Sequence, residues 1–287
     1  MRDMVAFSRL MRGATLAAAL WCVTTAGALR AEKALDDATG ALWDALRMER
    51  MIGVMRREGV SHSRELAEEM LPDGGSAYLR DRVEDIHEPG RLARMVRARF
   101  AAGLSGVDTA PLVAFFTSAE GREIIELEFA ARVAMLDPET EETARARYRA
   151  LVGEASQDVR LEATRAYVRA NDLIERNVTG ALNANMSFMF GLIEGGALSM
   201  SREQAIRSVR ADAGDVRRRT REWVYSYVLL AQDPLSVAQI RDYAALAATP
   251  EGRALNGTLF AAFGAMYREV SHALGRALAA EMAAQDL

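Results

Sequence analysis

The chain of 287 residues has little of several residue types that define whole protein classes. It contains one cysteine, six prolines and one lysine, Lys33. So few cysteines and prolines exclude a disulfide-stapled, collagen-like or proline-rich chain. Half of the residues are hydrophobic and 26% are charged, which is typical of a globular fold and not of a disordered or multi-span membrane protein. Alanine and arginine, both strong helix formers, are abundant, so composition predicts an all-α fold but no particular chemistry.

The motifs of common enzyme classes are missing as well. The sequence has no Gly-x-Ser-x-Gly or Ser-x-x-Lys motif, no dinucleotide-binding glycine pattern and no phosphate-binding loop. His62, His87 and His272 are far apart, and Glu84-x-x-His87 is only half of a di-iron carboxylate motif. We therefore expect surface histidines near helix ends, no metal site, no cofactor and no catalytic residues.

The N-terminus has the three parts of a secretory signal peptide. Arg2, Arg9 and Arg12 precede an apolar run, Ala14–Ala28, which ends in the small residues of a cleavage site. The run is shorter than the roughly 20 residues that a membrane span needs. We expect residues 1–28 to be removed, with a cut after Ala31 as an alternative. The expected location is the periplasm, and an uncleaved anchor in the inner membrane is the alternative.

Removal of this segment changes the composition of the mature chain. The only cysteine, Cys22, follows Trp21 instead of the small residue of a lipoprotein signal, so it is expected to leave with the peptide. A mature chain without cysteine excludes thiol nucleophiles and disulfides. Residues 1–28 carry a charge of +2, which takes the formal charge from −4 to −6. An acidic exported protein is a poor candidate for binding nucleic acid.

Apolar residues recur at helical spacing along the rest of the chain, and prolines stand at helix starts, as in Asp137-Pro138-Glu139. No stretch alternates with period two between turn signals, so no sheet is expected. Whether 157–196 forms one helix or two is open, because Gly180 and Gly191 interrupt it. The predicted helices are 33–58, 63–71, 76–103, 108–117, 119–136, 138–153, 157–196, 202–213, 215–232, 235–248 and 250–285.

Two segments of the chain resemble each other. Residues 119–135 align with 250–266, which lie 131 positions later, and eight of the 17 positions are identical. The same offset pairs Leu42 with Leu173 and Leu104 with Leu235, which predicts an internal duplication with halves 29–153 and 154–287. Whether the halves form one core or two is open. We interpret the shared positions as structural: Ser118, Glu120, Gly121, Arg122 and Phe129 in the first copy, and Thr249, Glu251, Gly252, Arg253 and Phe260 in the second.

The first copy also resembles a known family. Residues 115–122, Phe-Phe-Thr-Ser-Ala-Glu-Gly-Arg, are similar to the signature of the bacterial domain-of-unknown-function family 2059. That signature is an aromatic pair, a small polar cap, proline, glutamate, glycine and a basic residue. Here Ala119 replaces the proline, whereas the second copy keeps Pro250 and lacks the aromatic pair. The resemblance implies an exported helical protein and implies no activity or catalytic residue.

Charged residues gather in three places that could carry chemistry. Glu120, Glu123, Glu126 and Glu128 form a carboxylate cluster, but they alternate with arginines on a helix, which is more typical of a solvated face. Arginines gather at 91–99 and at 217–221, where they could contact anionic lipid headgroups. We favour ion-paired helix surfaces for both runs.

Residues 181–200 are unusually apolar and carry a single charge, Glu194. The first interpretation is a fully buried central helix. The alternatives are a methionine-rich groove for an apolar ligand or a partner helix, and a second membrane span. For the groove, the candidate contact residues are Met186, Phe188, Met189, Phe190 and Ile193.

The sequence favours a non-catalytic binding or scaffold module of the bacterial envelope. Its partner is undetermined, and an apolar or lipid ligand and another envelope protein are both open. The alternative is an envelope hydrolase that acts through glutamate and arginine, with Glu120 and Glu251 as the carboxylates to test.

Overall fold

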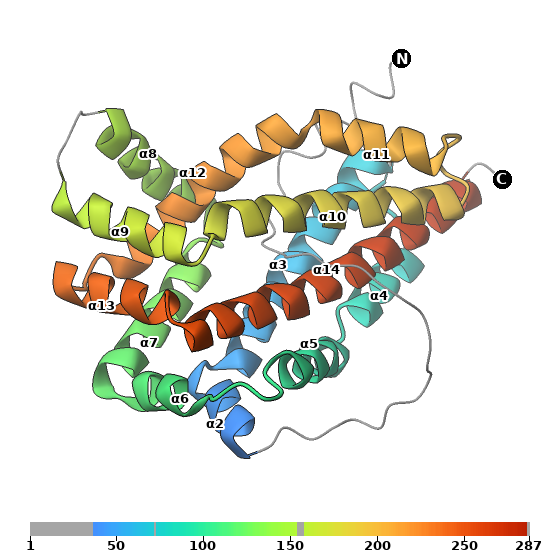
Figure 1. Cartoon of the computed structure of the whole chain (residues 1–287). Coiled ribbons are helices and arrows are strands. Elements are labelled where there is room, and N and C mark those ends of the chain that lie inside the picture. Colours follow the sequence, from blue (N-terminus) through green and yellow to red (C-terminus); the bar gives the residue numbers. More distant parts are fainter. Residues whose placement is uncertain (1–36, 72, 154–157, 286–287) are drawn as a thin grey trace.

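The computed structural model describes residues 37–71, 73–153 and 158–285, and every regular element in these ranges is an α-helix (Figure 1). The predicted all-α fold is confirmed. The signal segment 1–28, with Cys22, lies outside the described residues, so export stays a prediction. The helices are α2 (Asp37–Ala45), α3 (Met48–Met70), α4 (Ala77–Ile86), α5 (Pro89–Gly103), α6 (Ala110–Thr117), α7 (Ala119–Ala134), α8 (Pro138–Gly153), α9 (Val159–Ala170), α10 (Leu173–Glu194), α11 (Arg202–Ala211), α12 (Ala213–Gln232), α13 (Val237–Ala247) and α14 (Pro250–Gln285).

Several helix starts follow directly from local sequence. Ser201 Oγ accepts from the Gln204 amide while the Gln204 side chain accepts from the Ser201 amide, so the predicted capping box is confirmed. Ser236 and Gln239 make the same arrangement at α13. Each such cap satisfies amide groups that the first helical turn leaves without a partner.

Two predicted helices are broken in the structure, and the open question of one helix or two at 157–196 is answered by two. The predicted helix 33–58 is interrupted at Arg47, and its second part continues to Met70. The predicted helix 76–103 ends at Ile86, because Pro89 begins α5 and the Glu88 side chain caps it. The predicted helix 157–196 is interrupted at Asp172, whereas Gly180 and Gly191 lie inside α10.

The breaks at Arg47 and Asp172 have the same backbone geometry. Both residues are left-handed, with φ of 53° and 51°. This backbone conformation is strained for a residue other than glycine, so contacts with other parts of the fold must stabilise it. The two breaks lie 125 positions apart, whereas the similar segments lie 131 positions apart. Matching the breaks therefore needs a different alignment in this part of the chain from the one that pairs Leu42 with Leu173.

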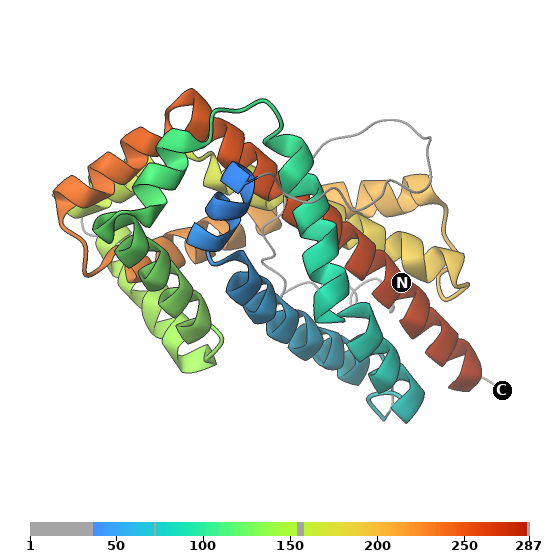
Figure 2. The ribbon, with the colours of Figure 1, turned by 90° about the horizontal axis from the view of Figure 1, so that it is seen from below.

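One large core joins the two halves of the chain. It contains Trp43, Phe100 and Phe116 from the first half and Tyr243, Phe263 and other residues from the second. Helix α14 of the second half packs against α5 of the first, and α7 of the first half packs against α12 of the second (Figure 2). The question of one core or two is therefore answered by a shared main core.

Helices α10 and α14 run side by side along much of their length (Figure 1). Glycines make their close approach possible, since a Cβ on Gly275 would lie 2.3 Å from the Phe188 carbonyl oxygen and one on Gly191 would lie 2.3 Å from that of His272. Near its C-terminal end, α14 is tied to the start of α4, because Glu281 accepts hydrogen bonds from the amide and hydroxyl of Ser76. In the described residues no helix has the length and apolarity to cross a membrane, which removes the alternative of a second span at 181–200.

The two similar segments have matching local structures. Ser118 Oγ accepts from the Gly121 amide at 3.0 Å, and Thr249 Oγ1 accepts from the Gly252 amide at the same distance. The arginine after each glycine donates to a backbone carbonyl five residues before it. A Cβ on either glycine would lie 2.1 Å from the carbonyl oxygen of Phe115 or Leu246, so only glycine fits. These likenesses are what a duplication would leave, and the duplication itself stays a prediction.

Candidate functional site

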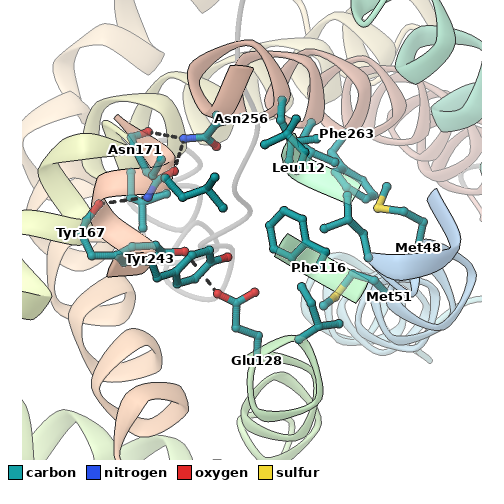
Figure 3. Close-up of a pocket in the computed structure, with 18 residues that line it drawn as sticks. Met48, Met51, Leu112, Phe116, Glu128, Tyr167, Asn171, Tyr243, Asn256 and Phe263 are labelled. Atoms are coloured by element: carbon teal, nitrogen blue, oxygen red, sulfur yellow. Dashed lines mark hydrogen bonds between the residues drawn. The ribbon is translucent and has the colours of Figure 1, made fainter. Parts of the chain in front are cut away.

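A cavity of about 180 Å³ lies between the two halves, where the ends of several helices meet (Figure 3). Its wall comes from α3, α6 and α7 of the first half and from α9, α10, α13 and α14 of the second. Residues next to both left-handed breaks also reach it. The lining residues are Leu46, Met48, Met51, Leu112, Phe116, Ile125, Glu128, Tyr167, Asn171, Leu173, Tyr243, Leu246, Ala247, Gly252, Leu255, Asn256, Leu259 and Phe263.

Many lining residues come in pairs from equivalent places in the two halves. Leu46 and Met48 flank Arg47 as Asn171 and Leu173 flank Asp172. The remaining pairs are 131 positions apart: Leu112 with Tyr243, Phe116 with Ala247, Ile125 with Asn256 and Glu128 with Leu259. Equivalent backbone positions of the two halves therefore line the cavity, but their side chains differ in chemistry. The carboxyl group of Glu128 in the first half corresponds to a leucine, Leu259, in the second.

Glu128 is the carboxyl group of this cavity. Tyr167 Oη donates to Glu128 Oε1 at 3.2 Å, and Tyr243 forms a second hydrogen bond with the side chain. Tyr227 donates to the backbone carbonyl of Glu128, which fixes this turn of α7 against α12. Burial raises the pKa of Glu128 to about 7, although the two tyrosine hydroxyls lower it. The carboxyl group therefore changes between its protonated and ionised forms near neutral pH.

Aromatic rings form one wall of the cavity beside this carboxyl. Tyr243 stacks on Tyr167 with ring centroids 4.8 Å apart and on Phe115 at 5.9 Å. Phe116 meets Tyr243 edge to face at 6.2 Å. Such packing holds the two hydroxyl groups at fixed positions, since tyrosine rings in stacked arrangements have little freedom to move.

Two asparagines continue the cavity wall beside Tyr167, across the hollow from Met48 (Figure 3). Asn256 Nδ2 donates to the backbone carbonyl of Asn171 at 2.9 Å and to its Oδ1 at 2.7 Å. Asn171 Nδ2 in turn donates to the Tyr167 carbonyl, at the last turn of α9. This chain of amides braces the left-handed break at Asp172 and commits both N–H groups of Asn256 Nδ2 to Asn171.

The raised pKa makes the stability of the protein depend on pH. The folded-state pKa is about 7 and the ordinary value is 4.5, so the folded state binds the proton more tightly and loses stability as pH rises through this window. We expect Glu128→Gln to be more stable than the wild type by about 3 kcal/mol at pH 8 and equally stable well below pH 4.5. Urea unfolding at pH 4.5, 6 and 8 measures this difference, and a pH-independent difference would contradict it.

The structure separates the four glutamates of the predicted carboxylate cluster. Glu126 pairs with Arg50 at 2.7 Å on the surface, as a solvated face predicts, and Glu123 is exposed. Glu128 turns inward to the cavity, so the solvated-face interpretation is wrong for this residue. Glu120 and Glu251, the carboxylates of the hydrolase alternative, lie in the first turns of α7 and α14 and do not line the cavity.

The other positions that the two segments share make contacts that stabilise the fold. Ser118, Gly121, Arg122 and their second copies make the helix starts described above. Phe129 lies under the Arg50 guanidinium at 3.9 Å, and Phe260 lies under that of Arg176 at 5.6 Å. Both arginines belong to the helix that follows a left-handed break, so these contacts hold α3 on α7 and α10 on α14.

The apolar stretch 181–200 is divided between two sides of α10. Phe188 and Met189 are buried, and Met186, Phe190 and Ile193 are partly buried. Met189 packs with Ala205 and Val209 of α11 in a small cluster that the three partly buried residues border. Helix α11 thus occupies part of the surface suggested for a ligand, and the contact role of these five residues stays a prediction.

The arginine runs and the histidines have partners within the chain. Arg91 pairs with Glu269 and Arg97 with Glu49, and at the other run Arg217 pairs with Glu175 and Arg218 with Asp215, which confirms the ion-paired interpretation for these four. The expectation of surface histidines is wrong for His87. Its ring is buried against Gly59, and its Nδ1 lies 2.9 Å from the Val83 carbonyl, because the α3–α4 contact closes over it.

Comparisons with known proteins were made on the whole chain. No known protein family, curated protein or solved structure matches it. The resemblance to family 2059 therefore stays a prediction. Function has to be argued from the cavity and its chemistry.

Proposed function

We propose that the protein is a non-catalytic binding module of the bacterial envelope that holds a small ligand in the cavity between its halves. The cavity carries this proposal, because it is largely apolar and receives a few polar groups from both halves. Ligand sites of proteins typically combine apolar walls with a small number of placed polar groups. Its position also supports the proposal, since a ligand there would contact both left-handed helix breaks.

The volume limits the size of the ligand. A cavity of 150 Å³ lined by leucine, isoleucine and phenylalanine is known to hold benzene. A cavity of about 180 Å³ therefore suits one ring with a short substituent, or an aliphatic group of similar size. A whole lipid is larger than this cavity. Of the ligands that the sequence left open, we therefore propose a small molecule about the size of one ring or of a lipid headgroup.

Binding without catalysis is supported by the groups that line the cavity. Glycosidic and peptide hydrolysis need two cooperating groups, such as a pair of carboxyls or a nucleophile with its base. Within the described lining, Glu128 is the one carboxyl, and the other titratable groups are tyrosines. The hydrolase alternative has no comparable support, because Glu120 and Glu251 lie outside the cavity.

A filled cavity tests the proposal. Leu259 lines the cavity, so Leu259→Phe puts a larger side chain into it and we expect binding of single-ring probes to fall by about tenfold or more. Ligand-observed NMR with a panel of neutral, cationic and anionic single-ring compounds measures the binding. The matched control is Leu127→Phe, since Leu127 is also partly buried but does not line the cavity.

The outcomes are distinct if both variants remain folded by circular dichroism. Binding that is lost in Leu259→Phe and kept in Leu127→Phe supports the cavity as the site. No binding by any probe, or equal losses in the two variants, would reject it.

Export to the periplasm belongs to the same proposal. It is supported by the predicted signal peptide at residues 1–28. The mass of the mature protein in the envelope fraction tests it, with Leu29 or Glu32 expected as the first residue. A mature protein that begins at Met1 would support the anchored alternative.

A further inference from the structure

The charge of the cavity wall is one-sided. Of the lining residues, Glu128 is the one that carries a full charge, and none is an arginine, a lysine or a histidine. Within the described chain, the groups that favour the charged form of Glu128 are the neutral hydroxyls of Tyr243 and Tyr167. Glu128 is partly buried, and a carboxylate that has lost part of its hydration without gaining a cation is only incompletely satisfied by the two hydroxyls. An anionic ligand would add a second negative charge to the same space.

The hydroxyl donors beside Glu128 and the amide donors of Asn256 are committed to the protein. Tyr167 Oη donates to Glu128 Oε1, and Asn256 Nδ2 donates to Asn171. The groups left for a ligand are therefore acceptors: the Glu128 carboxylate and Asn256 Oδ1. Figure 3 shows the second carboxylate oxygen of Glu128 on the side away from the tyrosines, facing the hollow. A ligand that donates several hydrogen bonds fits this set, and a ligand that only accepts does not.

The aromatic wall favours the same charge. Tyr243, Tyr167 and Phe116 lie together beside Glu128, and Phe263 lies on the far side of the cavity. The face of an aromatic ring carries partial negative charge and attracts ammonium groups, most strongly away from water. Carboxylate and rings on one side of a small cavity are therefore complementary to a cation with an apolar body.

We propose that the ligand is a small primary amine with one ring or a short apolar tail, bound as its ammonium cation between Glu128, the tyrosine wall and Asn256. This inference rests on the proposed binding function and adds the class of ligand. The ammonium donates to the Glu128 carboxylate and to Asn256 Oδ1. The apolar body fills the space lined by Leu112, Leu255 and Phe263.

Binding of the cation requires the ionised form of Glu128. The groups that face the carboxyl are Tyr243 on α13 and Tyr167 on α9, while Tyr227 on α12 contacts its backbone. On α7 itself, the charge of Arg132 is paired with Glu58 of α3. Because the pKa of Glu128 is about 7, part of the protein must release a proton when the amine binds at neutral pH. Affinity for the amine therefore rises between pH 5 and pH 8.

Three matched probes test the ligand class on the full mature chain. Phenethylamine is a cation, 2-phenylethanol is its neutral analogue, and phenylacetate is an anion of similar shape. Calorimetry at pH 8 is expected to show that the amine binds at least about tenfold more tightly than the alcohol, since a hydrogen bond to a charged group contributes about 1.5–3 kcal/mol. Phenylacetate is expected not to bind. At pH 7, titrations in two buffers of different ionisation enthalpy are expected to show proton release.

The variant Glu128→Gln keeps the shape of the side chain and removes its charge. We expect its preference for the amine over the alcohol to fall to less than about threefold. An alcohol that binds the wild type as tightly as the amine, or a variant that keeps the full preference, would overturn the amine and leave the cavity as a binding site. If none of the three probes binds, both the amine and the cavity proposal fail. Because the wild-type comparison needs no substitution, the test does not depend on the folding of the variant.

Discussion

Replacing Arg132 by methionine is expected to lower the free energy of unfolding by about 3–5 kcal/mol, the usual result of removing one partner of a buried ion pair. Arg132 Nε donates to Glu58 Oε1 at 2.7 Å, and a second bond joins Nη2 to Oε2. Only 8% of the Arg132 side chain and 18% of the Glu58 side chain are exposed. Burial alone would lower the pKa of Arg132, but the charge of Glu58 outweighs it and raises the pKa. Loss of the guanidinium leaves a poorly solvated carboxylate.

This ion pair lies where three helices meet, so its loss weakens the contacts among all three. Glu58 belongs to α3 and Arg132 to α7, and the guanidinium lies 4.9 Å from the ring of Trp223 on α12. The double variant Arg132→Met with Glu58→Leu is expected to recover most of the loss, because apolar residues of similar volume often replace a buried pair without cost. Urea unfolding of the two single variants and the double variant measures the coupling. Equal destabilisation in the single and double variants would contradict the explanation.

Replacing Gly275 by alanine is expected to lower the free energy of unfolding by about 2 kcal/mol, although alanine is the better helix former. The new Cβ would lie 2.3 Å from the Phe188 carbonyl oxygen and 3.1 Å from Gly191 Cα. These are backbone atoms, so α10 and α14 have to move apart along their contact.

Gly53 provides the matched control for this glycine. It also lies inside a helix, α3, but a Cβ there would meet nothing within 4 Å. Gly53→Ala is expected to raise stability by up to about 1 kcal/mol, because alanine loses less backbone entropy on folding. Thermal and urea unfolding of both variants separates the two effects. The close-packing argument fails if Gly275→Ala is as stable as Gly53→Ala.

The parts of the fold that local chemistry determines could be predicted from sequence. Helices α6, α7, α8, α11, α13 and α14 begin where a serine, threonine or proline stands at the start, and the box at Ser201 forms as its spacing requires. The left-handed breaks at Arg47 and Asp172 could not be predicted, because neither is a glycine and each is held by contacts from elsewhere. The Asn256–Asn171 bonds, between residues 85 positions apart, are one such contact.

The candidate site shows the same division between local and tertiary determinants. Glu128 stands in a charged segment with Glu120, Glu123 and Glu126. Nothing in the local sequence of α7 indicates that Glu128 points into the cavity. Its partners Tyr167 and Tyr243 come from 39 and 115 positions later, so only the tertiary fold brings them to the carboxyl. One signal was present in the aligned segments: Glu128 aligns with Leu259, and a charged residue opposite an apolar one marks a position that the two halves use differently.

The reciprocal packing of the two halves has a consequence for the origin of the chain. Helix α14 also packs on α5 of the other half, and α7 packs in the same way on α12, which occupies the place corresponding to α5. If the chain arose by duplication, one ancestral unit would have exposed the surfaces that these helices now cover. Such a unit would have been stable as a homodimer with exchanged C-terminal helices, and the cavity would have lain on its two-fold axis. Under that hypothesis, fusion into one chain would have let the two sides differ, so that Glu128 could stand in one half and Leu259 at the aligned position of the other.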